Sequence, residues 1–267
     1  MPAITPRHFV RLTFQRGGRV DTATRHRAVS VAACAALVSP LAWGQAAVSP
    51  RLSATAETHA TGVFLNPQGD VLTARHAVEH CRDILAVKDG RVVQARVRAI
   101  SNERDLAVLG TDLVPYLSAT FPERARAVEG SAGVFTEAYS VLQRMPQRGS
   151  VLSNALTVPG GEDLNLISGV KPGTSGSAVL RGDGLVAGVV VERVARWPGA
   201  ATGMLSRASG GAVLQGPSQV RAISAEQVKA FLRDNGIAFT QSDVPQLAPN
   251  QSPAARAATL AVGILCG

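Results

Sequence analysis

Aromatic residues and long hydrophobic runs are both scarce in this sequence. Phe, Trp and Tyr make up 4% of the 267 residues, so a hydrophobic core must be built mainly from Val, Leu, Ile and Ala. No uninterrupted apolar run reaches the roughly 18 residues that a membrane-spanning helix needs. A protein with several membrane spans is therefore excluded, and the 46% apolar and 17% charged residues indicate an ordinary globular chain rather than a disordered one.

Cysteine is scarce too. The chain contains three, Cys34, Cys81 and Cys266, and they lie far apart. Zinc fingers and small disulfide frameworks need more cysteines at closer spacing, so both classes are excluded.

Positive charge is in excess at one end of the chain only. The formal net charge is +8, but residues 1–46 contain six arginines and a single aspartate, which leaves +3 for all the residues that follow. That later part has no block of consecutive Lys or Arg, and no aromatic residues alternate with its arginines to form a stacking surface. We therefore expect no nucleic-acid partner.

The first 46 residues have the pattern of a secretory signal peptide. A basic group at residues 25–27 precedes an apolar stretch over residues 28–42, and small residues follow. These are the three parts of such a peptide, so we expect cleavage near Gly44 or Ala46, and no stable membrane insertion afterwards. A retained anchor is the alternative, but Pro40 and the short apolar stretch argue against it.

Export would leave two cysteines in the mature chain, because Cys34 lies within the signal peptide. Two thiols in an oxidising compartment usually pair. We therefore predict a disulfide between Cys81 and Cys266.

The rest of the chain consists mostly of short β-branched runs separated by turn signals such as Asp89-Gly90. This spacing predicts an all-β sandwich or barrel and argues against a sheet with alternating helices. The predicted strands are residues 61–64, 71–73, 83–87, 91–100, 106–109, 132–135, 150–158, 164–168, 178–180, 185–191 and 220–223.

One helix is predicted, over residues 225–235. Ser224 begins a capping box, apolar residues repeat at helical spacing, and Gly236 marks the end. Residues 241–256 are rich in Pro, Ser and Ala, which predicts a linker to a last strand over residues 259–265.

The positions of the histidines restrict the catalytic chemistry. All five lie at or before position 80, which excludes hydrolases whose serine comes first and whose histidine comes last. The order acid, histidine, serine needs an acid well before the histidine, and Glu57 and Asp70 are too near. The order histidine, aspartate, serine remains open.

Three segments provide that order. His76 follows a predicted strand, Asp105 precedes another, and Ser175 lies in a glycine-flanked turn over residues 173–177. A serine hydroxyl must pass its proton to a nearby base to act as a nucleophile, and a histidine base needs a carboxylate that holds its tautomer. The N–H groups of Gly173 and Ser175 are expected to form an oxyanion hole, which stabilises the negative oxygen of the intermediate.

These segments resemble the trypsin-like serine proteases of the chymotrypsin fold. The likeness is to the bacterial HtrA-like members, whose motifs look like LTNAHVV, DLALL and GNSGGP, although Thr174 replaces the asparagine of the last motif. Asp105 lies 29 positions after His76, and Ser175 lies 70 positions after Asp105, separations that are also similar. The resemblance implies an all-β, chymotrypsin-like double β-barrel with a C-terminal helix and a final strand. It implies a catalytic triad of His76 and Asp105 on the first barrel and Ser175 on the second.

The resemblance also implies the domain organisation. Too few residues follow the predicted helix for the PDZ domain of full-length HtrA proteins, so a short HtrA-like protease is expected. A cysteine soon after the histidine and another at the C-terminus resemble small secreted bacterial members, which supports the disulfide. The expected divisions are a signal peptide (1–46), a trypsin-like protease domain (52–240, with barrel 1 at about 52–120, barrel 2 at about 121–223 and the helix at 225–235), and a linker and strand held by Cys266 (241–267).

The substrate pocket follows from the same resemblance. Gly169 stands where trypsins have an acidic residue, so Arg or Lys before the cleaved bond is not expected, and Val170 favours a small or aliphatic side chain. Val190 and Val191 lie on the strand that resembles the one beside the substrate. The implied protein is a bacterial serine endopeptidase, periplasmic or secreted, that acts on polypeptides and needs no cofactor or metal ion.

Two alternatives remain. His76, Glu79 and His80 spell H-x-x-E-H, a zinc-peptidase pattern, but it needs a sustained helix and a third ligand downstream. Only about one helical turn fits before the next predicted strand, and no later histidine exists. The second alternative is a binding protein with the protease fold that has lost its activity.

Overall fold

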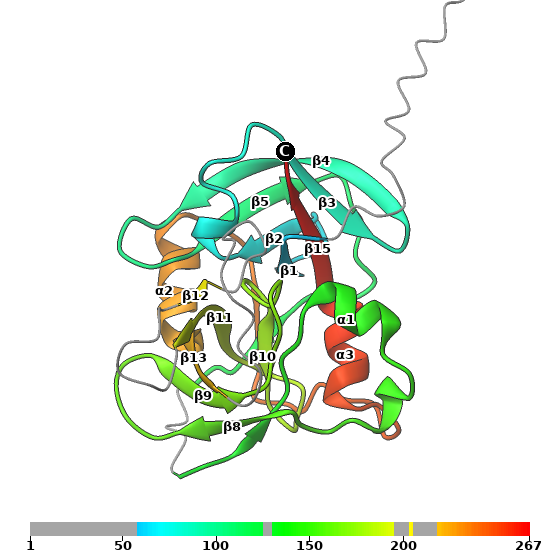
Figure 1. The fold of residues 1–267 in the computed structure, drawn as a ribbon, viewed down its shortest axis with the longest axis vertical. Coiled ribbons are helices and arrows are strands. Elements are labelled where there is room, and N and C mark those ends of the chain that lie inside the picture. The colour runs from blue at the N-terminus through cyan, green and yellow to red at the C-terminus, as the bar shows by residue number, and fades with distance from the viewer. Residues whose placement is uncertain (1–57, 125–129, 195–202, 205–217) are drawn as a thin grey trace, which may run out of the picture. The chain divides into compact units, whose positions relative to one another are not determined.

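The computed structural model describes residues 58–124, 130–194, 203–204 and 218–267. The predicted signal peptide lies outside these residues. Two β-barrels make up the described part of the chain (Figure 1), which confirms the all-β, chymotrypsin-like double barrel. No helix in the described ranges is long and apolar enough to cross a membrane.

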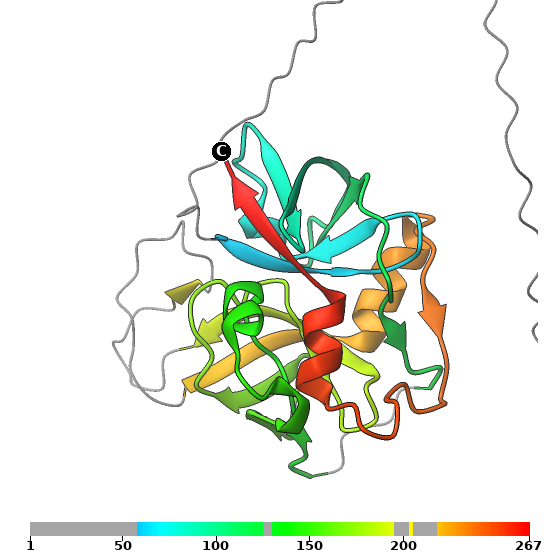
Figure 2. The same ribbon diagram turned by 90° about the vertical axis from the view of Figure 1, so that its right-hand side faces the viewer.

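The first barrel is closed by six antiparallel strands in the order β1-β15-β3-β4-β5-β2. The last strand of the chain, β15, lies between β1 and β3, with Gly263 opposite both Thr61 and Val87. Figure 2 shows β15 entering the barrel from the helix before it. The strands are β1 (Ala60–Phe64), β2 (Asp70–Thr73), β3 (Ile84–Lys88), β4 (Arg91–Ile100), β5 (Ala107–Thr111) and β15 (Ala261–Cys266).

The second barrel follows the order β10-β11-β13-β9-β8-β7. An antiparallel bridge between Phe135 and Leu180 joins its two edges. The short strand β12 pairs with β11. Strands β6 and β14 form a separate two-stranded parallel sheet outside this barrel. The strands are β6 (Thr120–Phe121), β7 (Gly133–Val134), β8 (Ala155–Val158), β9 (Leu164–Ser168), β10 (Ala178–Leu180), β11 (Val186–Val194), β12 (Gly203–Met204), β13 (Ser218–Ser224) and β14 (Thr240–Gln241).

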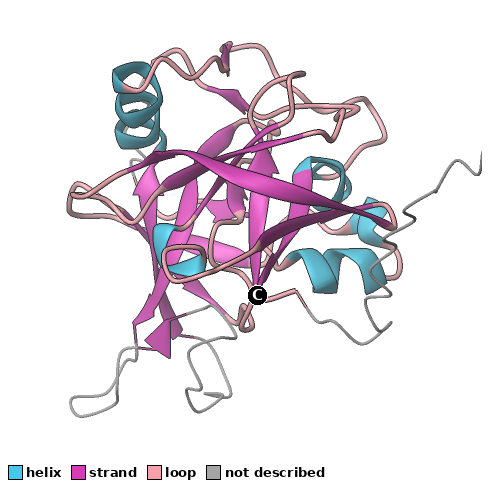
Figure 3. Ribbon diagram, turned by 90° about the horizontal axis from the view of Figure 1, so that it is seen from above, coloured by secondary structure: helices cyan, strands magenta, loops and turns pink. Residues whose placement is uncertain are grey.

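The helices lie outside the strands (Figure 3). They are α1 (Tyr139–Arg144), α2 (Ala225–Asp234), α3 (Pro253–Leu260) and the 3₁₀ turns η1 (Arg75–Ala77) and η2 (Arg148–Ser150). Helix α2 matches the prediction to within one residue, and Gly236, two positions after its last residue, has a φ of 63° that permits the left-handed turn. Its predicted capping box is wrong, because the side chain of Ser224 makes no capping hydrogen bond.

The prediction of a linker over residues 241–256 is wrong for its last residues, because helix α3 begins at Pro253. Ser252 caps this helix by accepting a hydrogen bond from the Ala255 N–H, and Pro253 occupies the first turn. Proline is well tolerated there because the first N–H groups of a helix have no partner within it. Alanine then favours helix over strand, so β15 begins at Ala261 rather than at Thr259.

The predicted disulfide between Cys81 and Cys266 is present, with a Cα–Cα distance of 5.1 Å. It fastens the end of β15 to the segment that follows η1. Backbone hydrogen bonds support the same junction, because Gly267 donates to the Asp83 carbonyl and accepts from the Arg82 N–H.

Candidate active site

His76 lies in η1, the turn that connects strands β2 and β3 of the first barrel. The Asp105 carboxylate holds this turn by two contacts. Oδ1 accepts the backbone N–H of His76 at 2.9 Å, and Oδ2 lies 2.5 Å from the ring Nδ1. The carboxylate therefore fixes both the turn and the orientation of the imidazole ring.

Asp105 ends the loop before β5. Burial alone would raise the pKa of its carboxyl, but the hydrogen bonds from His76, the charge of His76 and the nearby Arg75 outweigh that effect and lower the pKa. The carboxylate therefore stays ionised at neutral pH. An ionised acceptor at Nδ1 keeps the ring proton on that nitrogen, which leaves Nε2 free to act as a base.

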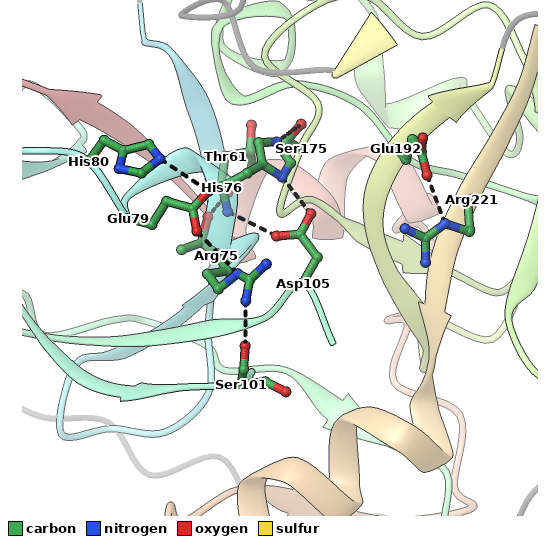
Figure 4. Close-up of polar contacts among 11 residues, drawn as sticks. Thr61, Arg75, His76, Glu79, His80, Ser101, Asp105, Ser175, Glu192 and Arg221 are labelled. Atoms are coloured by element: carbon green, nitrogen blue, oxygen red, sulfur yellow. Dashed lines mark hydrogen bonds and ion pairs between the residues drawn. The ribbon is translucent and has the colours of Figure 1, made fainter. Parts of the chain in front are cut away.

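Ser175 lies in the turn between β9 and β10, on the second barrel. Its Oγ is 3.0 Å from Nε2 of His76. The structure thus brings the three predicted residues into one hydrogen-bonded chain, Asp105 to His76 to Ser175, across the two barrels (Figure 4). The site is closely packed, since the His76 side chain is 4% exposed and Ser175 is fully buried.

The turn before Ser175 depends on a glycine. Gly173 has a φ of +95°, a conformation that other residues rarely adopt. Among the described residues, no atom accepts a hydrogen bond from the N–H of Gly173 or of Ser175. Two unused backbone donors beside the serine hydroxyl have the chemistry of an oxyanion hole.

The predicted pocket residues divide between two groups. Val170 and Val190 are buried together in the core of the second barrel, and Gly169, which is exposed, precedes Val170. Val191 belongs instead to the larger core cluster, which contains residues of both barrels and of the helices, because successive side chains of a strand point to opposite faces. The structure therefore separates Val191 from the other three.

Arg193 is a buried cation that the sequence analysis did not identify. It is 6% exposed, and its Nε donates to Oγ of Ser218. Ser218 pairs across the sheet with Ser168, the residue before Gly169. Burial lowers the pKa of Arg193, although an arginine remains charged. Its position on a strand of mostly apolar residues was the available sequence signal.

The H-x-x-E-H pattern does not form a zinc-binding face. Both ring nitrogens of His76 contact other side chains, Asp105 and Ser175. The His80 side chain is 90% exposed and pairs with Glu79. The segment forms a single 3₁₀ turn, so the two histidines do not share the face of a helix.

A cavity of about 1050 Å³ lies elsewhere on the second barrel, between the β8–β9 hairpin, the turn at residues 181–183 and the start of α2. Arg104 contributes to its wall, but His76, Asp105 and Ser175 do not. The reactive groups, rather than this cavity, therefore define the candidate site.

Comparison with known proteins gives one family match. Residues 60–189 match the family described as trypsin-like peptidase domain, a region that includes His76, Asp105 and Ser175. This match confirms the resemblance to trypsin-like serine proteases. No curated protein matches the chain.

Solved structures similar to this chain include three proteases. An inactive variant of the Rv3671c protease from M. tuberculosis is 18% identical over 67% of this chain and 81% of that chain, with a TM-score of 0.44. A serine endoprotease from Yersinia pestis is 17% identical over 66% of this chain and 57% of that one, with a TM-score of 0.44. An HtrA-type protease with a tripeptide is 19% identical over 66% and 55%, also with a TM-score of 0.44.

Proposed function

We propose that this chain, whose residues 60–189 form a trypsin-like peptidase domain, is an exported serine endopeptidase that works through an acyl-enzyme. The observation that carries the proposal is the continuous hydrogen-bonded chain from Asp105 through His76 to Ser175. A carboxylate, an oriented imidazole and a hydroxyl in this order are what activation of a serine requires.

The reaction follows from the geometry. Nε2 of His76 takes the proton of the Ser175 hydroxyl while Oγ attacks the peptide carbonyl. The N–H groups of Gly173 and Ser175 stabilise the negative oxygen, and Asp105 stabilises the imidazolium. His76 then gives the proton to the leaving amine, which leaves an acyl-Ser175 ester. Water, deprotonated by His76, hydrolyses the ester and restores the serine.

The residue at position 169 supports substrates without Arg or Lys before the cleaved bond. Gly169 provides no carboxylate to pair with a basic side chain. Burial of an unpaired cation is costly, so neutral side chains fit best.

Export is supported by two independent features. The first 46 residues have the pattern of a signal peptide, and Cys81 is bonded to Cys266. Structural disulfides are typical of proteins that work in an oxidising compartment such as the periplasm or the exterior.

One observation favours the second candidate, an inactive binding protein with the same fold. Ser175 has no exposed surface, so a substrate must displace neighbouring groups to reach its hydroxyl. The same test separates the two functions, because a binding protein associates with polypeptides without cleaving them.

The test is digestion of unfolded casein by the mature protein, with mass spectrometry of the products. We expect internal cleavage by the wild type and by Ser150→Ala, a control that removes an exposed hydroxyl bonded only to a local carbonyl. Ser175→Ala should lower kcat by about 10⁶-fold. A folded wild type that cleaves no faster than Ser175→Ala would overturn the proposal.

A further inference from the structure

Thr61, on β1 of the first barrel, contacts the serine turn of the second barrel at two points. Its N–H donates to the Ser175 carbonyl at 2.9 Å, and its Oγ1 donates to the Gly173 carbonyl at 2.7 Å. These partners lie more than 100 positions along the chain from Thr61, which is 1% exposed. One residue therefore holds the carbonyl groups of both residues whose N–H groups form the candidate oxyanion hole.

The direction of the hydroxyl bond is determined by its surroundings. Oγ1 of Thr61 also accepts the backbone N–H of Tyr139 at 2.8 Å. A hydroxyl has one proton, and a carbonyl oxygen can only accept, so the proton of Thr61 points at Gly173. The carbonyl of Thr61 accepts in turn from Oγ1 of Thr73 at 2.7 Å. Hydrogen bonds to residues outside the turn, Tyr139 and Thr73, therefore hold both the hydroxyl and the carbonyl of Thr61.

Two other carbonyls of this segment, those of Lys171 and Thr174, also have partners within the second barrel. Oγ1 of Thr174 donates to the Lys171 carbonyl at 2.6 Å, and the Ser177 N–H donates to the Thr174 carbonyl at 2.9 Å. The N–H groups of Gly173 and Ser175 donate to nothing in the described ranges. Four carbonyls of residues 171–175 are therefore held by hydrogen bonds, while these two N–H donors are unused among the described residues.

We propose that Thr61 is a positioning residue for the oxyanion hole, an inference that rests on the proposed function. Its hydroxyl fixes the peptide plane after Gly173, so Gly173 cannot rotate about its ψ angle without losing a buried hydrogen bond. The spacing between the Gly173 and Ser175 N–H groups is therefore set from the first barrel, the same barrel that holds His76 and Asp105. Thr61 itself touches no reacting atom.

The test compares Thr61→Val, which removes the hydroxyl at nearly constant volume, with Thr61→Ser, which keeps it. Loss of one oxyanion donor lowers kcat by about 10²–10³-fold. A donor that is displaced rather than removed should lower kcat by a smaller factor. We expect Thr61→Val to lower kcat by about 10–100-fold with little change in KM, and Thr61→Ser to retain most of the wild-type kcat. The substrate is a fluorogenic peptide built on a casein cleavage site.

A matched control is Thr157→Val in β8. Thr157 is 1% exposed, and its hydroxyl likewise accepts a backbone N–H, from Ala132, and donates to a backbone carbonyl, that of Gly130. This variant should lose stability while retaining kcat. If Thr61→Val does not fold, Thr61→Cys, with a weak thiol donor in the same space, takes its place in the comparison.

A second measurement separates positioning from general loosening. A peptide aldehyde forms a tetrahedral adduct whose oxygen needs the oxyanion donors, so its affinity should fall in Thr61→Val by the same factor as kcat/KM. A wild-type kcat in Thr61→Val, or an equal loss in Thr61→Ser and Thr157→Val, would overturn the inference. A wild type that neither cleaves the peptide nor binds the aldehyde would instead overturn the proposed function.

Discussion

Removal of the disulfide by the double change Cys81→Ala and Cys266→Ala should lower the stability of the fold substantially. The bond joins residues 185 positions apart. In the chain-entropy model, a loop of that length constrains the unfolded chain by about 5 kcal/mol. For a domain of this size, 1 kcal/mol shifts Tm by about 2–4 °C, so Tm should fall by about 10–20 °C.

The native contacts around the bond explain why the effect should act mainly on the unfolded state. Strand β15 remains paired with β1 and β3, and Gly267 keeps its backbone hydrogen bonds to Arg82 and Asp83. The variant should therefore fold to the same structure. The assay is thermal unfolding followed by circular dichroism, with thiol titration of denatured wild type to verify that the bond was formed. A Tm within 3 °C of a fully oxidised wild type would refute the reasoning.

Three further changes test the site and its support. Asp105→Asn should lower kcat by about 10⁴-fold with little change in KM, because the amide no longer holds His76 in the reactive tautomer; steady-state kinetics measure both constants. Burial raises the pKa of the Glu137 carboxyl above its unfolded value, although the Ala138 N–H and Lys171 act to lower it. The folded state therefore favours the protonated form, and it loses stability as the pH rises from the unfolded pKa to the folded one. Glu137→Gln should therefore melt above the wild type at neutral pH, and this difference should vanish below the unfolded pKa of about 4.3. Gly176→Ala should destabilise the fold by well over about 1 kcal/mol, because a Cβ there would lie 2.0 Å from a backbone oxygen; Gly90→Ala, with an equally positive φ but open space, is the control in chemical denaturation.

Much of the site could be predicted from sequence because its parts are local. His76, Asp105 and Ser175 each lie in a short motif at the end of a strand, and their order along the chain admits a single arrangement. The strands β3, β4 and β9 also lie where the β-branched runs and the turn residues place them, to within one residue. Local turn chemistry and strand propensity agree with the fold at these positions.

The missed features depend on contacts between distant residues. The hydroxyl of Thr61 has its role only because Gly173 folds against it, and no pattern near Thr61 reveals that partner. Strand β15 closes the first barrel between β1 and β3, which its position after the second barrel does not indicate. Helix α3 differs from the prediction for a different reason: the Pro/Ser/Ala composition indicates a linker, whereas the cap at Ser252 begins a helix.

The central claim is that Ser175 is an activated nucleophile, and covalent labelling tests it most directly. Purified mature protein is treated with a fluorophosphonate and its intact mass is measured, beside Ser175→Ala and an EDTA-treated sample. We predict one adduct on the wild type, none on Ser175→Ala, and full labelling in EDTA. A folded wild type that forms no adduct, or an adduct that persists in Ser175→Ala, would contradict the claim.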